Sequence, residues 1–411
     1  MSPSRHLDVV VLGAGIQGVC VTLALAAAGH RVTIVDAAED CLRRTSVRNE
    51  GKIHLGLVYA NDPSGRTAEL MLDGACAFAD LIEGWIGHPL PWASLSSRPF
   101  TYAVLEDSLL SADALFDAYT RLDSNFAARD RAHYLGTAPE RLWREIDLRD
   151  LRSQFAPGAI TAAAATAEVA LDTQGLAEEL RAALHAHPGV ETRYGHTVRS
   201  ADRTPTGFRV GGTRVDGEPW SLESPVVVNC LWGNRIALDA HLGIAPSRPW
   251  VYRLKYRVLG RLPAELEDLP SLTLVLGRFG DIVVHPGRPT YLSWYPACLA
   301  GWASSPAPPE DWADACAGRD DRAEARHLAR ATLAGLADIV PALADFEVET
   351  IDAGIIAAWG TTDIDDPESE LHERFDIGVH AHDGWYSIDT GKYTTAPLFA
   401  AKLAALVDPP T

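Results

Sequence analysis

The sequence has few cysteines, a shortage of positive charge and no long apolar run. Its six cysteines are scattered, with no C-x-x-C pair and no cluster with histidine, so we expect reduced thiols in a cytoplasmic protein and no metal site. The 36 lysines and arginines face 55 aspartates and glutamates, and the net charge of −19 disfavours nucleic acid and anionic membranes as partners. No apolar stretch is long enough to span a bilayer, and the first one is too short for a signal-peptide core.

What the chain does have is an ordinary globular composition, 47% hydrophobic and 22% charged. Its 411 residues exceed what one compact core usually holds, which predicts two domains or subdomains. Nothing in the composition indicates an oligomeric state.

Residues 7–36 are the most informative stretch. Residues 9–12 are a short apolar run typical of a buried parallel strand, and 31–35 predict a second strand. Between them, 19–28 predict an apolar, alanine-rich helix that ends at Gly29.

Three glycines at G-x-G-x-x-G spacing join the first strand to this helix. Gly13 permits a tight turn, Gly15 leaves room for a pyrophosphate against the backbone, and Gly18 lets the helix pack closely on the strand. The helix N-terminus favours phosphate, and Asp36 at the end of the second strand can accept hydrogen bonds from an adenosine ribose. The pattern predicts a dinucleotide site. The alternative is a βαβ unit with coincidental glycines.

Hydrophobic periodicity outlines the rest of the chain. A polar, arginine-rich loop follows Asp36, helices are predicted over 64–86, 108–132 and 138–154, and prolines break the pattern at 88–99.

After residue 161 the sequence predicts a helix capped by Thr173 and a strand over 191–199. A small meander follows, and then a second buried strand over 225–234 that could join the first sheet. The remaining predicted elements are antiparallel strands over 250–297 with a hairpin at 286–289, a loop over 301–320, a helix over 321–339 and a final strand, turn and helix.

The fold class is therefore expected to be α/β, and α+β overall. A Rossmann-like nucleotide-binding domain would be discontinuous, with a mainly antiparallel β-sheet substrate domain inserted into it. The expected boundaries are 1–86, 155–245 and 345–411 for the nucleotide-binding domain, and 87–154 and 246–344 for the substrate domain.

These segments resemble the D-amino-acid oxidase superfamily of FAD-dependent oxidoreductases. The loop NEGKIHLGLVYANDPSGRTAEL, with Ile53-His54-Leu55-Gly56, looks like the loop under the flavin in L-2-hydroxyglutarate and glycerol-3-phosphate dehydrogenases. The ending TGKYTTAPLFAAKLA looks like the flavin-contacting C-terminal segment of the glycerol-phosphate branch, and VVVNCLWGN is similar to a second FAD-contacting strand.

The resemblance implies FAD as the cofactor and a set of residues that hold it. Lys392 and the helix that begins near Pro397 would offset negative charge on the reduced flavin. The expected cofactor-binding residues are Gly13, Gly15, Ile16, Gln17, Gly18, Asp36, Arg44, Thr45, Arg48, Asn49, Glu50, Gly51, Lys52, His54, Val169, Cys230, Trp232, Gly233, Gly391, Lys392, Tyr393, Thr394 and Thr395.

Hydride transfer from a C–H bond beside oxygen or nitrogen also needs an acceptor for the substrate's proton. His54 is the best candidate, because imidazole titrates near neutral pH. Covalent attachment to FAD and a purely structural hydrogen bond are the alternatives for this residue.

A polar or anionic substrate must also be fixed. Alternation in VYRLKYRV places Arg253, Lys255 and Arg257 on one face of a strand and Tyr252 and Tyr256 on the other. Arg253 and Tyr256 join His54 as catalytic candidates, against the alternative of a solvated basic face over an aromatic core face. Further candidates on the adjoining hairpin are His285, Tyr291 and Tyr295.

Amino-acid oxidases of the superfamily usually carry a G-x-R-P-like element whose arginine holds the substrate carboxylate, whereas AAWGTTDID at 357–365 has none. We therefore expect oxidation of CH–OH in a hydroxy acid or polyol-like small molecule, with oxygen or another acceptor taking the electrons. One alternative is an amine or amino-acid oxidase that holds the carboxylate with Arg253 or Arg278. The others are a non-catalytic nucleotide-binding protein and an NAD-dependent dehydrogenase, in which the TGKYTT segment would have no role.

Overall fold

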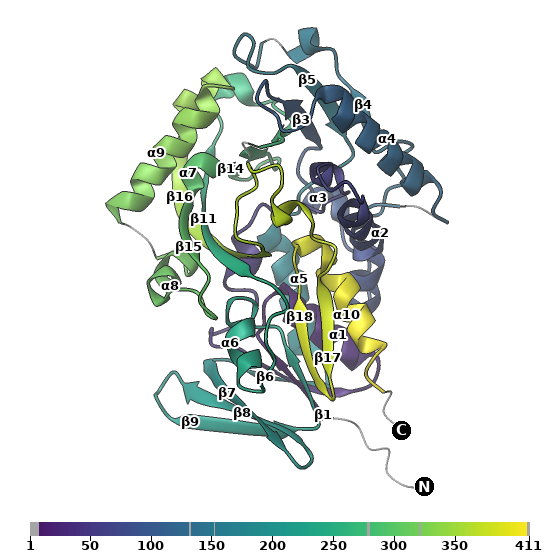
Figure 1. Ribbon diagram of the computed structural model, residues 1–411, viewed down its shortest axis with the longest axis vertical. Helices are drawn as coiled ribbons and strands as arrows, with labels where there is room; N and C mark the ends of the chain where they lie inside the picture. The colour runs from purple at the N-terminus through teal and green to yellow at the C-terminus, as the bar shows by residue number, and fades with distance from the viewer. Residues whose placement is uncertain (1–7, 131–132, 152, 278–279, 320–321, 409–411) are drawn as a thin grey trace.

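The computed structural model describes residues 8–130, 133–151, 153–277, 280–319 and 322–408 (Figure 1). Arg278 lies outside these residues. The described chain forms two large sheets and one small sheet, with helices packed around them. This confirms the expected fold class.

The first sheet has six strands and begins with the predicted β1–α1–β2 unit. Its strands are parallel except for the antiparallel pair at one edge. In spatial order they are β17 (Gly378–His382), β18 (Trp385–Asp389), β10 (Val226–Asn229), β1 (Asp8–Leu12), β2 (Arg31–Val35) and β6 (Val190–Arg193). The second buried apolar strand of the sequence thus lies beside the first, as expected.

The second sheet has nine strands and is mainly antiparallel. Its order is β15 (Leu299–Ala303), β11 (Trp250–Arg261), β14 (Thr290–Trp294), β13 (Gly280–Val283), β12 (Ser271–Val275), β3 (Phe100–Val104), β5 (Ala162–Thr166) and β4 (Trp143–Glu145), with β16 (Glu347–Trp359) pairing with β11. The domain boundaries stay a prediction, but β5 and β16, which those boundaries assign to the nucleotide-binding domain, hydrogen-bond within this sheet.

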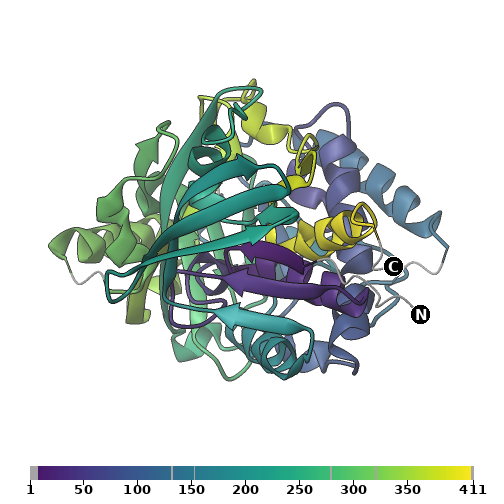
Figure 2. The same ribbon diagram turned by 90° about the horizontal axis from the view of Figure 1, so that it is seen from below.

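The predicted meander forms the small sheet, which covers one face of the six-stranded sheet (Figure 2). Its strands are β7 (His196–Thr204), β8 (Gly207–Arg214) and β9 (Pro219–Ser224). The helices are α1 (Ile16–Ala27), α2 (Arg66–Ile86), α3 (Trp92–Leu95), α4 (Ala112–Ala127), α5 (Thr173–Ala186), α6 (Arg235–Ala240), α7 (Tyr295–Cys298), α8 (Ala313–Cys316), α9 (Ala323–Ala337) and α10 (Ala396–Ala404). None of the described helices is long and apolar enough to cross a membrane.

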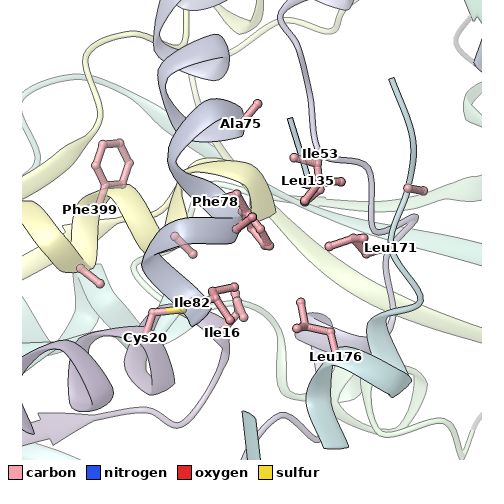
Figure 3. Close-up of a cluster of buried hydrophobic side chains, with 14 of the residues drawn as sticks. Ile16, Cys20, Ile53, Ala75, Phe78, Ile82, Leu135, Leu171, Leu176 and Phe399 are labelled. Carbon is pink, nitrogen blue, oxygen red and sulfur yellow. The ribbon is translucent and has the colours of Figure 1, made fainter. Parts of the chain in front are cut away.

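The main core lies where α1, α2, α5 and α10 meet (Figure 3). Nearly every residue of α1 is buried, which explains its largely apolar sequence. Cys20 and Phe78 bring α1 and α2 into this cluster, and Phe399 brings α10. The last helix of the chain therefore packs on the first, and this contact sets the tail against the opening turn.

Several expected elements are wrong in detail. The helix expected over 138–154 is wrong, because Trp143–Glu145 pairs with β5 as an edge strand. The N-cap of α5 is Asp172 rather than Thr173, since its carboxylate accepts from the backbone N–H groups of Gln174 and Gly175. The strand expected over 191–199 is broken into β6 and β7, and the loop expected over 301–320 contains the end of β15 and α8.

Candidate functional site

A cavity of about 760 Å³ lies between the six-stranded and nine-stranded sheets. Its wall includes the opening turn of α1, residue Asp36 after β2, the loop 43–54, the turn after β10, and the tail before α10. Lys255 and Tyr291 from the nine-stranded sheet close the opposite side. Segments that are far apart in the sequence therefore converge on one space, large enough for a dinucleotide.

The opening turn has the features expected of a pyrophosphate cradle. Gly13 has a φ of +93°, and a Cβ there would lie 2.7 Å from the Cys230 carbonyl oxygen. A Cβ on Gly18 would lie 1.8 Å from the Gly13 carbonyl oxygen, so the helix packs on the turn as predicted. Gly15 lines the cavity and caps α1 without a side chain.

Asp36 lies beside this turn at the cavity wall. Its carboxylate accepts hydrogen bonds from the backbone N–H groups of Ala14, at 2.6 Å, and Ala38, at 2.8 Å. The hydroxyl of Ser46, a residue that sequence reasoning did not select, accepts from the Ile16 N–H at 2.8 Å. The glycines, the helix start and the fixed carboxylate together fit the ADP half of FAD.

Most of the expected cofactor-binding residues reach the cavity. Those that line it are Gly13, Gly15, Ile16, Gln17, Asp36, Arg44, Thr45, Arg48, Asn49, Glu50, Lys52, His54, Cys230, Trp232, Gly233, Gly391, Lys392, Tyr393. The others lie behind the wall and are Gly18, Gly51, Val169, Thr394, Thr395.

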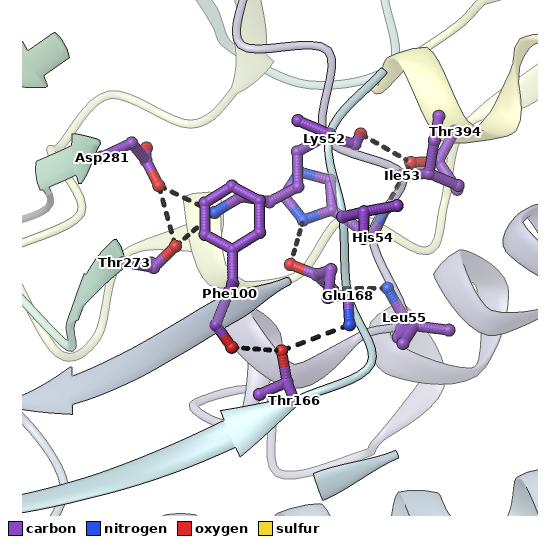
Figure 4. Close-up of polar contacts among 12 residues, drawn as sticks. Lys52, Ile53, His54, Leu55, Phe100, Thr166, Glu168, Thr273, Asp281 and Thr394 are labelled. Atoms are coloured by element: carbon purple, nitrogen blue, oxygen red, sulfur yellow. Dashed lines mark hydrogen bonds and ion pairs between the residues drawn. The ribbon is translucent and has the colours of Figure 1, made fainter. Parts of the chain in front are cut away.

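The tail and the loop that carries His54 are held together directly. The Thr394 hydroxyl accepts from the His54 backbone N–H at 2.8 Å and donates to the Lys52 carbonyl at 3.3 Å. The Lys52 ammonium turns away from the tail and pairs with Asp281 at 2.7 Å (Figure 4).

His54 is a buried residue on the cavity wall. Burial, together with the charges of Lys392 and Lys52, holds the pKa of its imidazole well below the usual value. The ring is therefore neutral at pH 7 and can accept a proton. Its Nδ1 lies 3.8 Å from Oε1 of Glu168, a fully buried carboxyl that the sequence analysis did not select (Figure 4).

The alternative of a solvated basic face on β11 is wrong, because all three cations are buried and paired. Arg253 lies 2.8 Å from Asp363, Lys255 lies 3.7 Å from Glu50, and Arg257 forms a two-point contact with Asp352.

The catalytic candidates on β11 do not reach the cavity. Arg253 is buried with Asp363, and alternation turns Tyr256 into a hydrophobic cluster where its hydroxyl accepts from Arg322 at 3.2 Å. On the adjoining hairpin, Tyr291 and Tyr295 line the cavity, whereas His285 does not.

Arg374 supplies a cation that sequence reasoning missed. It lies in the irregular segment between β16 and β17, is 8% exposed, and forms no ion pair within the described part of the chain. Its charge lowers the pKa of both His54 and Lys392. Glu50 is an anion that acts on both His54 and Lys392. Burial would raise the pKa of its carboxyl, but the charges of Lys255 and Lys392 lower it overall.

Lys392 is half-buried at the cavity wall, and it too has no ion-pair partner among the residues described. Burial and the charge of Arg374 lower the pKa of its ammonium group to about 7. Lys392 on the cavity wall and Arg374, which is buried but does not itself line the cavity, are thus two cations that lack a carboxylate partner within the described part of the chain, which is the arrangement expected around an anionic ligand.

Lys392→Met is expected to stabilise the apoprotein at pH 6 by roughly 2–5 °C in Tm, since it removes a charge that burial disfavours. The pKa of Lys392 is lower in the folded than in the unfolded state, so the unfolded state binds more protons between pH 7 and about 10. The wild type therefore gains stability as pH rises through this window, and the difference from Lys392→Met shrinks. Thermal melts of both apoproteins across this range test it. Lys402→Met, at an exposed lysine of α10, is the control, and parallel curves for wild type and Lys392→Met would contradict the prediction.

Comparison with known proteins adds independent information. The chain matches the family described as DAO, FAD dependent oxidoreductase, over residues 8–406. A stretch of 50 residues is 46% identical to D-amino acid dehydrogenase of Neisseria meningitidis serogroup C, and this match spans only 12% of each protein.

Solved structures share the fold over nearly the whole chain. Glycine oxidase from Geobacillus kaustophilus has a TM-score of 0.67 at 17% identity, covering 98% of this chain and 95% of that one. L-Proline dehydrogenase from P. horikoshii has a TM-score of 0.65 at 13% identity, with coverage of 98% and 93%. Iminodiacetate oxidase from Chelativorans sp. has a TM-score of 0.65 at 16% identity, with coverage of 97% and 94%.

Proposed function

The chain belongs to the DAO family of FAD-dependent oxidoreductases, and from this premise we propose that it oxidises the Cα–N bond of a small amino or imino acid. The observation that carries the proposal is the pair of unpaired cations, Arg374 and Lys392, beside a neutral His54. A carboxylate supplies the missing negative charge, and a neutral imidazole can accept the amine's proton.

The similar proteins named above are oxidases and dehydrogenases of amino and imino acids. This favours the CH–NH alternative over the hydroxy-acid expectation. The expectation rested on the missing arginine at 357–365, and Arg374 supplies a cation from a neighbouring segment instead. The family match also favours FAD over the NAD alternative and catalysis over a purely structural nucleotide site.

FAD, when bound, supplies the acceptor for the hydride that leaves the substrate's α-carbon. Arg374, which lies outside the cavity lining but whose charge acts on both His54 and Lys392, would hold the substrate carboxylate, and Lys392 would provide positive charge at the cavity wall. His54 would take one proton from the substrate nitrogen, so that the substrate loses two electrons and two protons and leaves as an imine. Water then converts the imine to an oxo acid and ammonia or an amine.

Anaerobic spectra of the holoenzyme test this function. We expect amino or imino acids to bleach the flavin absorbance near ~450 nm, with ammonia or an amine and an oxo acid as products. Hydroxy acids with the same side chains are the matched control. They should act at least ~100-fold less efficiently, because they lack the N–H group that the site would recognise. Bleaching by the hydroxy acids but not by amino or imino acids would overturn the proposal.

A further inference from the structure

We propose that Glu168 is a positioning residue that holds the His54 ring with Nδ1 toward the protein interior and Nε2 available to the substrate. The inference rests on the proposed function, because it takes His54 as the proton acceptor. It adds a residue from outside the cavity wall and assigns each ring nitrogen its role.

The Glu168 carboxyl is fixed from two directions. Its Oε2 accepts from the Leu55 backbone N–H at 2.6 Å (Figure 4). Its Oε1 accepts from the Tyr102 hydroxyl at 2.5 Å. The residue is 0% exposed and lies just after β5, in an otherwise apolar run. The nearby Lys52 is already paired with Asp281, so Glu168 is not needed to balance that charge.

His54 faces this carboxyl with a ring nitrogen that has no other partner. Nδ1 is buried and accepts or donates no hydrogen bond within the described residues, and Oε1 of Glu168 lies 3.8 Å from it. That separation is longer than a hydrogen bond, but catalytic contacts often tighten only when substrate binds. The Thr394 hydroxyl holds the backbone of His54, and the ring packs edge-on to Tyr59, so the ring is already placed beside Glu168.

The contact selects one tautomer. Burial raises the pKa of Glu168, but both of its oxygens already accept hydrogen bonds, from Leu55 and Tyr102. A carboxyl that accepts in this way also accepts from Nδ1, so Nδ1 carries the hydrogen and Nε2 keeps its lone pair for the substrate. During the reaction the substrate's proton moves to Nε2, Nδ1 keeps its own, and Glu168 takes none. The other charged groups that act on the ring are Lys392, Lys52, Glu50 and Arg374.

Glu168→Gln tests the assignment with almost no change in size. The amide can still accept from Leu55 or Tyr102, but its NH₂ group can face Nδ1 and favour the opposite tautomer. We expect flavin reduction to slow about 100-fold, with FAD content unchanged and the substrate Kd within about threefold.

The matched control is Asp239→Asn, which makes the same carboxylate-to-amide change in another buried network. Asp239 accepts from Asn229, Trp385 and Ser387 and does not line the cavity. Asp239→Asn should lower Tm about as much as Glu168→Gln does, but it should leave flavin reduction unchanged. Equal slowing in both variants would make Glu168 merely structural and would overturn the proposal.

A second measurement does not depend on substrate. In ¹⁵N-histidine-labelled holoenzyme, the His54 signals are identified by their loss in His54→Asn. We expect protonated Nδ1 and unprotonated Nε2 in the wild type, and the reverse in Glu168→Gln. Identical tautomers in both proteins would overturn the inference. If no amino acid reduces the wild type, the proposed function fails, and the tautomer comparison still decides the role of Glu168.

Discussion

His54→Asn is expected to slow anaerobic flavin reduction at least ~100-fold while FAD stays bound, because the substrate's proton loses its acceptor. Stopped-flow absorbance with a saturating substrate measures this directly. The ionisation of His54 should slow the wild type only in acid, since the pKa of His54 lies well below its usual value and the ring is already neutral at pH 7. The variant should lose that acid limb.

His285→Asn is the matched control for this experiment. His285 is also partly buried, and burial lowers the pKa of its imidazole to about 4, but it does not line the cavity. Near-wild-type reduction in His54→Asn would rule out the role as base. Acid precipitation of the wild type separates the covalent alternative, because an attached flavin would stay with the polypeptide and would be released from His54→Asn.

Local sequence was sufficient to predict the geometry of the first βαβ unit. The turn at Gly13, the close packing at Gly18 and the carboxylate of Asp36 depend on residues within one βαβ unit, and each has the predicted geometry. The contact between the tail and the His54 loop spans 340 residues, and only the family resemblance brought these two segments together.

The burial of the three cations of β11 could not be predicted from the alternation of residues along the strand. Alternation separated Arg253 and Lys255 from Tyr256 correctly, but the basic face was not predicted to be buried. Burial depends on the counter-charges Asp363 and Glu50, which lie more than 100 residues away from their partners in the sequence. No local signal indicates such a pairing.

Arg374 was missed for a related reason. It lies in an irregular segment with no periodicity, and tertiary contacts bring it to the site: its backbone N–H donates to the Thr67 hydroxyl at 2.8 Å, and Arg66 stacks on Phe375 at 3.9 Å. The sequence did contain a hint of Glu168, because an acidic residue within the apolar run ATAEVAL is either exposed or buried with a specific role.

Arg374→Gln is expected to raise the KM for a carboxylate substrate about 100-fold, because breaking a buried charge pair typically costs about 2–5 kcal/mol. The KM for an amine that lacks the carboxylate should change little, so the enzyme should lose its preference for the acid over the amine. Arg374→Lys should recover part of it, since the charge returns without the two-point geometry. The pKa of Lys392 should also rise, because Arg374 is one of the charges that lower it.

Arg66→Gln is the control for this experiment. It removes an exposed arginine that packs on Phe375 of the same segment, and it leaves the cavity wall unchanged. If it impairs substrate binding as much as Arg374→Gln does, the effect comes from the segment's packing and the carboxylate is held elsewhere.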